Sequence, residues 1–386
     1  MTTAGAFDFG TAGRIVFGPG RAAELPSLID GWGTRALVCT GADPERHRRL
    51  LDMLPVPVEV FPVVGEPTVE MAGIATDAAR AAGADLVIAI GGGSVLDLGK
   101  SVAMLLGNGG QPLDYLEVIG RGLSITEPSA TFVAIPTTAG TGSEVTANAV
   151  LASPDHGRKA SVRSAFMIPR LALVDPLLTL GCPPAVTAAS GLDALTQCLE
   201  PLVSGSANPV TDALATAGLR STAAGLRRAY LDGSDVEART DMALAALLGG
   251  MSLANAKLGA VHGFAGVIGG MVTSAHGAIC AALLAPVTEI NVRALADREP
   301  LHPALDRYRQ AAGALTGRPD ATIEEGIEWI RETVAALEVP GLAELGIGAG
   351  MVDDIVAKTG TASSTKGNPI VLTEAELREA LDRSMN

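Results

Sequence analysis

The stretch that decides the fold is Ile88-Ala89-Ile90-Gly91-Gly92-Gly93-Ser94-Val95-Leu96-Asp97. It begins in an apolar run, 86–90, of the kind that forms a strand buried in a parallel sheet. Three glycines follow, which let the backbone come close to a ligand, and then a helical pattern begins. The first turn of such a helix offers unpaired N–H groups and the positive end of the helix dipole. The stretch therefore predicts an anion site that suits the pyrophosphate of a dinucleotide, although it lacks the GxGxxG fingerprint.

A second loop of the same character is Pro136-Thr137-Thr138-Ala139-Gly140-Thr141-Gly142-Ser143-Glu144, which follows the apolar run 131–135. It carries four hydroxyl side chains and two glycines. Ligands bind to parallel α/β sheets at the carboxyl ends of the strands. We therefore expect the two loops to lie side by side at that edge of the sheet.

The segments on either side of these loops alternate between strand and helix. Further strands are expected over 35–39, 58–63 and 171–174, and a helix over 69–82, which together predict a doubly wound α/β sheet. After residue 175 strand patterns nearly vanish, and helical patterns follow over 185–203, 209–229, 234–256, 303–315 and 322–337. The paired prolines Pro183-Pro184 mark the boundary. The chain is thus predicted to form an α/β domain, 1–180, and an all-helical domain, 181–386.

Composition excludes several classes of protein. The 386 residues carry a formal net charge of −14, so nucleic acid and anionic membrane surfaces would repel the chain. The four cysteines, Cys39, Cys182, Cys198 and Cys280, form no CxxC pair and are typical of small core residues in a reducing compartment. The first ten residues do not resemble a signal peptide, and the most apolar stretches, such as 278–287, are too short to span a bilayer. A cytoplasmic protein is expected.

The motifs taken together resemble the iron-containing (group III) alcohol dehydrogenases, nearly from end to end. Besides the two loops and Lys100, the matching segments are Phe7-Asp8-Phe9-Gly10, Ile15 to Gly20, Asp175-Pro176, Gly191 to Thr196, Val261-His262-Gly263 and His276-Gly277. The resemblance implies the dehydroquinate-synthase-like fold. In that fold a dinucleotide-binding α/β domain precedes an all-helical domain for metal and substrate, and the active site lies in the cleft between them. It also implies a homodimer or larger oligomer.

The resemblance carries over the cofactor site and leaves one departure. The residues that match the family's dinucleotide contacts are Gly91, Gly92, Gly93, Ser94, Asp97, Thr137, Thr138, Thr141 and Lys159. NAD-preferring members often have an aspartate after the second strand to hold the ribose hydroxyls, and here that position is Gly41. Because glycine does not repel a 2′-phosphate, the cofactor is NAD or NADP, with Asp43 a further ribose contact.

The family's metal ligands, an aspartate and three histidines, are only partly present. Asp193, His262 and His276 match, but Gln197 stands where the family has its first histidine. Asp193 and Gln197 are four residues apart and so share one helix face, and the amide oxygen of Gln197 is a weak neutral ligand. One carboxylate and two imidazoles suffice for a catalytic divalent metal, with Fe²⁺, Zn²⁺ or nickel all compatible. A further family histidine near the nicotinamide is replaced by Gly266.

These observations lead to one main functional hypothesis and two alternatives. The main hypothesis is an NAD(P)-dependent hydride transfer between nicotinamide and a small alcohol, aldehyde or keto compound, with Asp193, His262 and His276 as the catalytic and metal-binding residues. The first alternative is a metal-independent, maleylacetate-type reductase, in which His262 or His276 supplies the proton and Arg163 or Arg170 holds a substrate carboxylate. The second is a dehydroquinate-synthase-like lyase that uses NAD transiently.

Overall fold

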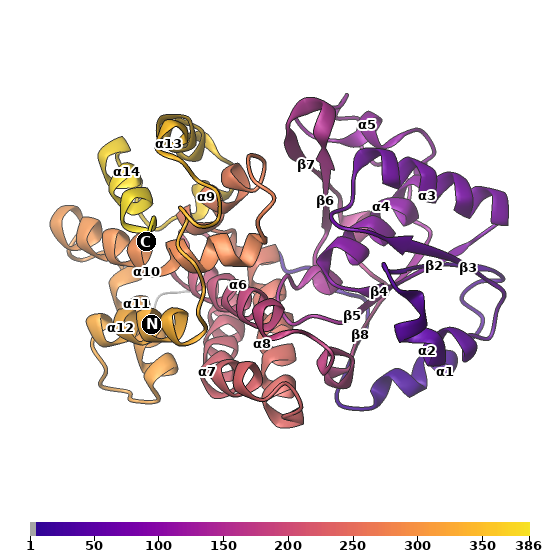
Figure 1. Cartoon of the computed structure of the whole chain (residues 1–386), viewed down its shortest axis with the longest axis horizontal. Coiled ribbons are helices and arrows are strands. Elements are labelled where there is room, and N and C mark those ends of the chain that lie inside the picture. The colour runs from indigo at the N-terminus through magenta and orange to yellow at the C-terminus, as the bar shows by residue number, and fades with distance from the viewer. Residues whose placement is uncertain (1–4) are drawn as a thin grey trace. The chain divides into compact units, whose positions relative to one another are not determined.

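The computed structural model describes residues 5–386, which form two compact units. The α/β unit comprises Gly10–Thr138 and Gly142–Leu180. The helical unit comprises Gly181–Asn386, together with Ala139–Thr141 and the described residues before Gly10. In Figure 1 the α/β unit is drawn in indigo to magenta and the helices of the other unit run from magenta to yellow. Each unit is described by itself.

The α/β unit is built on a parallel sheet of six strands. In sheet order they are β1 (Ile15–Phe17), β8 (Leu171–Val174), β5 (Thr131–Pro136), β4 (Leu86–Gly91), β2 (Ala36–Gly41) and β3 (Val58–Val63). Each pair of neighbours runs in the same direction. The predicted α/β fold with a parallel sheet is confirmed. The sequence prediction omitted β1, a strand of three residues.

Side chains on the two faces of the sheet enter different cores, which is what makes the sheet doubly wound. In β2, Leu37 and Cys39 pack into one core with α3 (Val69–Ala82) and α4 (Gly93–Asn108). Ala36 and Val38, which point the other way, pack into a second core with α1 (Leu25–Leu28) and α2 (Arg48–Asp52). Wholly apolar strands such as β4 are therefore required, because both of their faces are covered.

An antiparallel hairpin of β6 (Asn148–Ser153) and β7 (Arg158–Arg163) was also absent from the sequence prediction. Its strands mix small and polar residues, and their burial alternates along the chain. The hairpin packs against α4 (Figure 1). A single turn of helix, α5 (Pro112–Tyr115), lies earlier in the chain.

A buried lysine ties α4 to the second glycine-rich loop and to the hairpin. The Lys100 ammonium donates to the Ser143 carbonyl (2.8 Å), the Thr146 hydroxyl (3.0 Å) and the Asn148 carbonyl (2.6 Å). Burial lowers the pKa of Lys100 to about 8, although Asp97 and Glu144 nearby oppose this. Lys100 thus donates hydrogen bonds to oxygens that are shielded from water and could not be satisfied by it.

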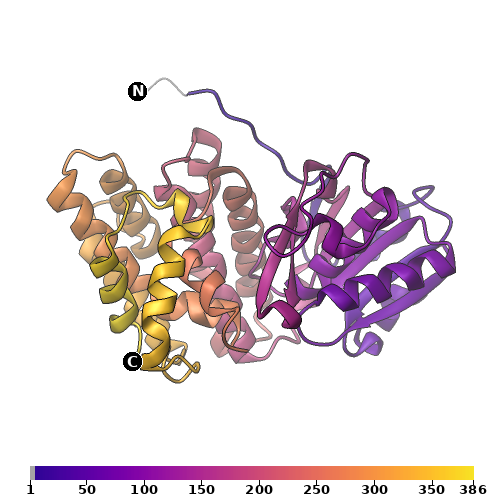
Figure 2. The same cartoon turned by 90° about the horizontal axis from the view of Figure 1, so that it is seen from above.

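The helical unit contains nine α-helices between residues 181 and 386. They are α6 (Pro184–Val203), α7 (Pro209–Leu231), α8 (Val236–Ala256), α9 (Ala260–Ile268), α10 (His276–Arg298), α11 (Ala304–Thr316), α12 (Ile323–Ala336), α13 (Val352–Thr361) and α14 (Glu374–Arg383). Five of them, α6, α7, α8, α11 and α12, lie where the sequence predicted helices. Figure 2, seen from above, shows the yellow α14 lying along the other helices of this unit.

Helix α10 corrects one expectation. The sequence predicts that the apolar stretch 278–287 is too short to span a bilayer. This stretch lies within a helix of 23 residues, which is by length and composition apolar enough to cross a membrane. In the structure, however, 72% of its apolar window is buried inside the protein. It is apolar because it packs against α6, α9, α12 and α14, as expected for a core helix.

We expect Lys100→Met to destabilise the α/β unit by about 3 kcal/mol, because buried oxygens lose their hydrogen-bond donor and the buried Asp97 carboxylate loses its nearby positive charge. Denaturant unfolding measures the change. Lys358→Met is the control, since Lys358 forms an exposed pair with Asp354 within one helix. Equal stability of the Lys100 and Lys358 variants would contradict a supporting role for Lys100.

Candidate metal centre and cofactor loops

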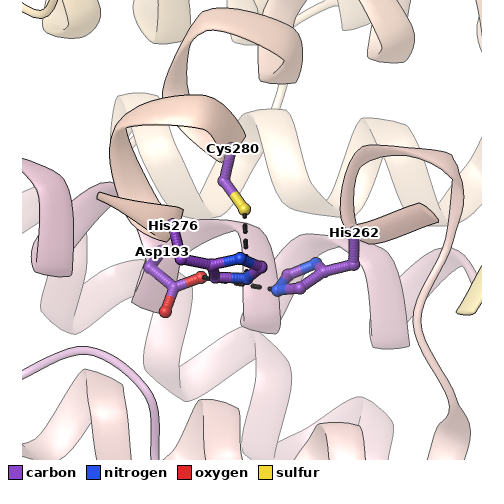
Figure 3. A group of neighbouring side chains, drawn as sticks. All are labelled: Asp193, His262, His276 and Cys280. Carbon is purple, nitrogen blue, oxygen red and sulfur yellow. Dashed lines mark hydrogen bonds and ion pairs between the residues drawn. The ribbon is translucent and has the colours of Figure 1, made fainter. Parts of the chain in front are cut away.

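Three helices of the helical unit bring the predicted metal ligands together. Asp193 and Gln197 lie one turn apart on α6, His262 lies in the first turn of α9, and His276 begins α10. Asp193, Gln197 and His262 are buried, whereas 38% of the His276 side chain is exposed. Figure 3 shows the side chains of Asp193, His262 and His276 pointing toward one another from their separate helices.

The glycine after His276 explains how α10 comes so close to α6. A Cβ at Gly277 would lie 2.1 Å from the Ala189 carbonyl oxygen of α6, closer than real Cβ atoms approach other atoms. The glycine after His262 has another neighbour: a Cβ at Gly263 would lie 2.1 Å from the Thr365 hydroxyl, so Gly263 leaves room for that side chain beside α9.

The donor atoms of this group are separated by distances that leave room for an ion between them. His262 Nε2 lies 3.4 Å and His276 Nε2 lies 3.9 Å from Asp193 Oδ1. The two imidazole rings are tilted, with their centres 5.5 Å apart. These separations exceed the length of a normal hydrogen bond.

Glu200 is a functional residue that the sequence reasoning missed. It lies on the same face of α6 as Asp193 and Gln197, and its Oε2 is 2.7 Å from His262 Nδ1. Its Oε1 accepts a hydrogen bond from the Val261 backbone N–H, also at 2.7 Å. A carboxylate on Nδ1 fixes the ring and aims Nε2 at the site, as is usual for metal-binding histidines. The signal in the sequence is a glutamate seven residues after Asp193 in an otherwise apolar helix.

Gln197 adopts a definite orientation beside Asp193. Its amide nitrogen donates to Asp193 Oδ2 at 2.9 Å, which leaves Oε1 directed elsewhere. Within residues 5–386, three buried atoms of the group have no hydrogen-bond partner: Asp193 Oδ1, Gln197 Oε1 and His262 Nε2. Buried polar atoms are rarely left unsatisfied. A cation bound between Asp193 Oδ1 and His262 Nε2 would satisfy both of these atoms, so the residues present fit a metal.

Charge leads to the same conclusion. Burial alone lowers the pKa of His262, but the close Asp193 and Glu200 carboxylates, the second of which is hydrogen-bonded to the ring, outweigh burial and raise that pKa to about 10. Burial alone raises the pKa of Asp193, and the closeness and charge of His262 and His276 more than reverse this. Two buried carboxylates on one helix face require positive charge beside them, supplied by a proton or by a metal ion.

Cys280 is the second residue that the sequence reasoning did not assign to the site. It lies one turn after His276 on α10, and its Sγ is 3.7 Å from His276 Nε2 (Figure 3). Asp193, His262, His276 and Cys280 each offer one donor atom, and these atoms all lie within 4.8 Å of one another. The prediction of Cys280 as a small core residue accounts for its burial but not for its neighbours.

The two glycine-rich loops are neighbours in the α/β unit, as the sequence predicted. Gly91 pairs with Pro136 across β4 and β5, and the Thr137 backbone N–H donates to the Gly91 carbonyl at 3.0 Å. A Cβ at Gly91 would lie 2.4 Å from the Val95 side chain, so glycine is required there. Gly92 is the N-cap of α4, with Gly93 and Ser94 in the first turn, an arrangement suited to an anion.

Other residues predicted to bind the cofactor are Gly41, Lys159, Asp97 and Thr141, and they differ in what surrounds them. Gly41 ends β2, next to β4, and open space surrounds the position of a Cβ there. Lys159 pairs with Glu66 at 2.6 Å. Asp97 accepts from the Ser143 hydroxyl at 2.6 Å and from the Val150 N–H at 3.0 Å, so both its oxygens help to hold the second loop. Thr141 belongs to the helical unit.

A parallel doubly wound sheet with two glycine-rich loops, joined in one chain to a helical unit with a carboxylate–imidazole cluster, defines a dinucleotide-dependent dehydrogenase of the metal-binding class. The chain belongs to the iron-containing alcohol dehydrogenase family. The model of "Iron-containing alcohol dehydrogenase" matches residues 12–176, and that of "Fe-containing alcohol dehydrogenase family, C-terminal" matches residues 187–385.

Individual relatives agree with this assignment. The chain is 34% identical to a 4-hydroxybutyrate dehydrogenase of Cupriavidus necator, over 83% of this chain and 82% of the relative. The solved structure of a 1,3-propanediol oxidoreductase matches with a TM-score of 0.90 at 29% identity, covering 98% of this chain and all of that one. The sulfoacetaldehyde reductase of Bifidobacterium kashiwanohense, solved with NAD⁺, matches with a TM-score of 0.88 at 26% identity over 99% of each chain.

Family membership confirms the predicted class of enzyme. The chain is an oxidoreductase of the alcohol dehydrogenase type, and its family binds NAD(H) and a divalent metal. The two arginines considered for a substrate carboxylate are engaged within the α/β unit. Arg163 pairs with Glu117 at 2.8 Å, and the Arg170 guanidinium lies 3.9 Å above the centre of the Trp32 ring.

We expect Glu200→Gln to weaken binding of a divalent metal about 10- to 100-fold. The amide oxygen of glutamine can accept from only one of the two donors, Val261 N–H or His262 Nδ1–H, so the imidazole loses its fixed orientation. Calorimetric titration of metal-free protein with Zn²⁺ measures the effect. Glu344→Gln, at an exposed position of the same unit, is the control, and equal affinities of the two variants would contradict the role of Glu200.

Proposed function

We propose that the chain catalyses reversible hydride transfer between NAD(P)(H) and small primary alcohols or their aldehydes, with a divalent metal in the helical unit. Residues 1–180 act as the dinucleotide-binding domain and residues 181–386 as the metal and substrate domain. The observation that carries the proposal is the convergence of Asp193, His262 and His276 from three helices. Within residues 5–386, the buried Asp193 Oδ1 and His262 Nε2 of this group have no hydrogen-bond partner. When bound, the metal supplies Lewis acidity to the substrate oxygen.

The chain's own residues have distinct tasks in this reaction. Asp193, His262 and His276 hold the metal, and Glu200 orients His262. Gln197 orients Asp193 through its amide N–H. The exposed side of His276 is the side from which substrate enters. Gly266 provides no imidazole for proton relay, so at that position the chain itself supplies no group that could take the alcohol proton.

The dinucleotide binds along the two glycine-rich loops. Gly91, Gly92, Gly93 and Ser94 receive the pyrophosphate at the first turn of α4, and Thr137, Thr138 and Thr141 add hydroxyl donors. Lys159 adds positive charge. Asp97 contributes by holding the second loop through Ser143, because its carboxylate already accepts two hydrogen bonds.

The substrates we propose are short hydroxylated chains. The relatives named for 4-hydroxybutyrate and 1,3-propanediol act on small linear molecules with a terminal hydroxyl and a second polar group. We further propose a cytoplasmic homodimer. The family resemblance supports the dimer, and the four unbridged cysteines among the described residues support a reducing compartment.

The test is an assay of NAD⁺ and NADP⁺ reduction with 1,3-propanediol, 4-hydroxybutyrate and ethanol, before and after removal of metal by a chelator. Activity should disappear on chelation, return with Zn²⁺ or Fe²⁺, and be abolished in Asp193→Ala. Full activity of Asp193→Ala, together with loss in His262→Ala, would favour the metal-independent reductase instead. Turnover with no net change in nicotinamide redox state would favour the lyase.

We expect Gly41→Asp to reduce kcat/KM for NADPH by about tenfold or more while changing the value for NADH little. A carboxylate at the end of β2 repels a 2′-phosphate, and the open space at Gly41 accommodates it without strain. Steady-state kinetics with both cofactors measure the change. Gly205→Asp, at another unobstructed glycine, is the control. An unchanged NADPH to NADH ratio in Gly41→Asp would show that residue 41 does not face the ribose.

A further inference from the structure

At one of its four ligand positions, the metal site differs from the ligand set implied by the family. Where the family has its first histidine, this chain has Gln197, whose amide nitrogen faces Asp193. The only donor left on that side chain is a neutral amide oxygen, the weakest ligand available here. Asp193, His262 and His276 therefore supply three strong ligand atoms. A fourth strong ligand has to come from another side chain.

Cys280 occupies a position that can complete the set. His276 and Cys280 are four residues apart on α10 and so point from the same face. Figure 3 shows the Cys280 sulfur directed at His276 and its neighbours. Cys280 is buried, in contrast to the half-exposed Cys182, and the Gly277 contact described above holds this turn of α10 against α6.

The spacing of the donors matches tetrahedral coordination. With metal–nitrogen and metal–oxygen bonds of about 2.0–2.2 Å and a metal–sulfur bond of about 2.3 Å, tetrahedral ligand atoms lie roughly 3.3–3.7 Å apart. The separations here are 3.4 Å for His262 to Asp193, 3.9 Å for His276 to Asp193 and 3.7 Å for His276 to Cys280. The other three pairs of donor atoms lie within 4.8 Å of one another, so the group must contract by up to about 1 Å to bring all four atoms onto one tetrahedral ion.

A thiolate ligand is compatible with the charges at the site. On binding, the Cys280 thiol releases its proton to solvent and the thiolate sulfur donates an electron pair to the metal. Asp193 and the thiolate then balance the two positive charges of a divalent cation within the ligand set. Glu200 keeps one negative charge outside that set, where it accepts from the His262 Nδ1–H and the Val261 N–H.

We propose that Cys280 is the fourth protein ligand of the metal, and that the resulting Asp–His–His–Cys set selects Zn²⁺ over Fe²⁺. A thiolate is a softer ligand than imidazole or carboxylate and favours zinc. This proposal rests on the proposed function for the presence of a metal at this site, and it adds the identity of the metal and of a ligand that the family pattern lacks.

The test uses full-length, metal-free protein titrated with Co²⁺ alone, which reports its ligands by absorption. We expect a thiolate-to-cobalt charge-transfer band in the near ultraviolet together with the visible bands of a tetrahedral ion. The charge-transfer band should be lost in Cys280→Ser and kept in Gln197→Leu. Cys198→Ser, a buried cysteine of the same unit, is the matched control and should keep the band.

The affinities provide a second readout. We expect competition titrations to show that the wild type binds Zn²⁺ at least about tenfold more tightly than Fe²⁺, and that Cys280→Ser lowers Zn²⁺ affinity by about tenfold or more. A wild-type cobalt complex without the charge-transfer band would overturn the proposal. So would a band that persists in Cys280→Ser, or one that disappears in Gln197→Leu.

These outcomes separate this proposal from the proposed function. Metal-dependent alcohol oxidation without a charge-transfer band would leave the function standing and remove Cys280 from the ligand set. A charge-transfer band without nicotinamide-dependent oxidation would keep Cys280 in the ligand set and contradict the proposed function. If Cys280→Ser does not fold, as judged by thermal unfolding, the spectra of Cys39→Ser, Cys182→Ser and Cys198→Ser still decide the question, because a band kept in all three variants comes from Cys280.

Discussion

Two buried carboxylates on one face of α6, Asp193 and Glu200, impose the constraint on which the helical unit depends. Burying negative charge is costly unless hydrogen bonds and positive charge are brought to it. His262 satisfies Glu200 through Nδ1 and turns Nε2 toward Asp193, and His276 completes the approach from α10. Gly277 allows α10 to come near enough to α6. The contacts that pack α9 and α10 against α6 therefore also build the site. Among the described residues, Asp193 Oδ1 and His262 Nε2 have no hydrogen-bond partner, as expected of a cation site.

The α/β unit buries a positive charge instead. The Lys100 ammonium needs oxygen atoms that accept its hydrogen bonds. Ser143, Thr146 and Asn148 supply them, and Asp97 accepts from Ser143 in turn. This network fixes the second glycine-rich loop beside the first, where the parallel strands β4 and β5 end. If the proposed dinucleotide site is at these loops, their backbone is ordered before the ligand binds, which reduces the entropy lost on binding.

The sequence was most informative where local patterns determine structure. The predicted strand 58–63 and helix 69–82 coincide with β3 and α3, because apolar periodicity and the Thr68 cap and Gly83 terminator are local signals. The β6–β7 hairpin was missed, since its short strands carry no strong apolar pattern. Glu200 and Cys280 were missed because their roles arise from contacts between helices more than sixty residues apart in the chain or from the direction of one helix turn, neither of which a single sequence displays.

The measurement that tests the central claim most directly is a crystal structure of the protein loaded with Zn²⁺ and NAD⁺, with diffraction recorded on both sides of the zinc absorption edge. The account predicts one anomalous peak within about 2.0–2.4 Å of Asp193 Oδ1, His262 Nε2, His276 Nε2 and Cys280 Sγ. It also predicts the pyrophosphate of NAD⁺ at Gly91 to Ser94. A metal bound elsewhere, or these four side chains joined only by protons and water in zinc-loaded crystals, would contradict it.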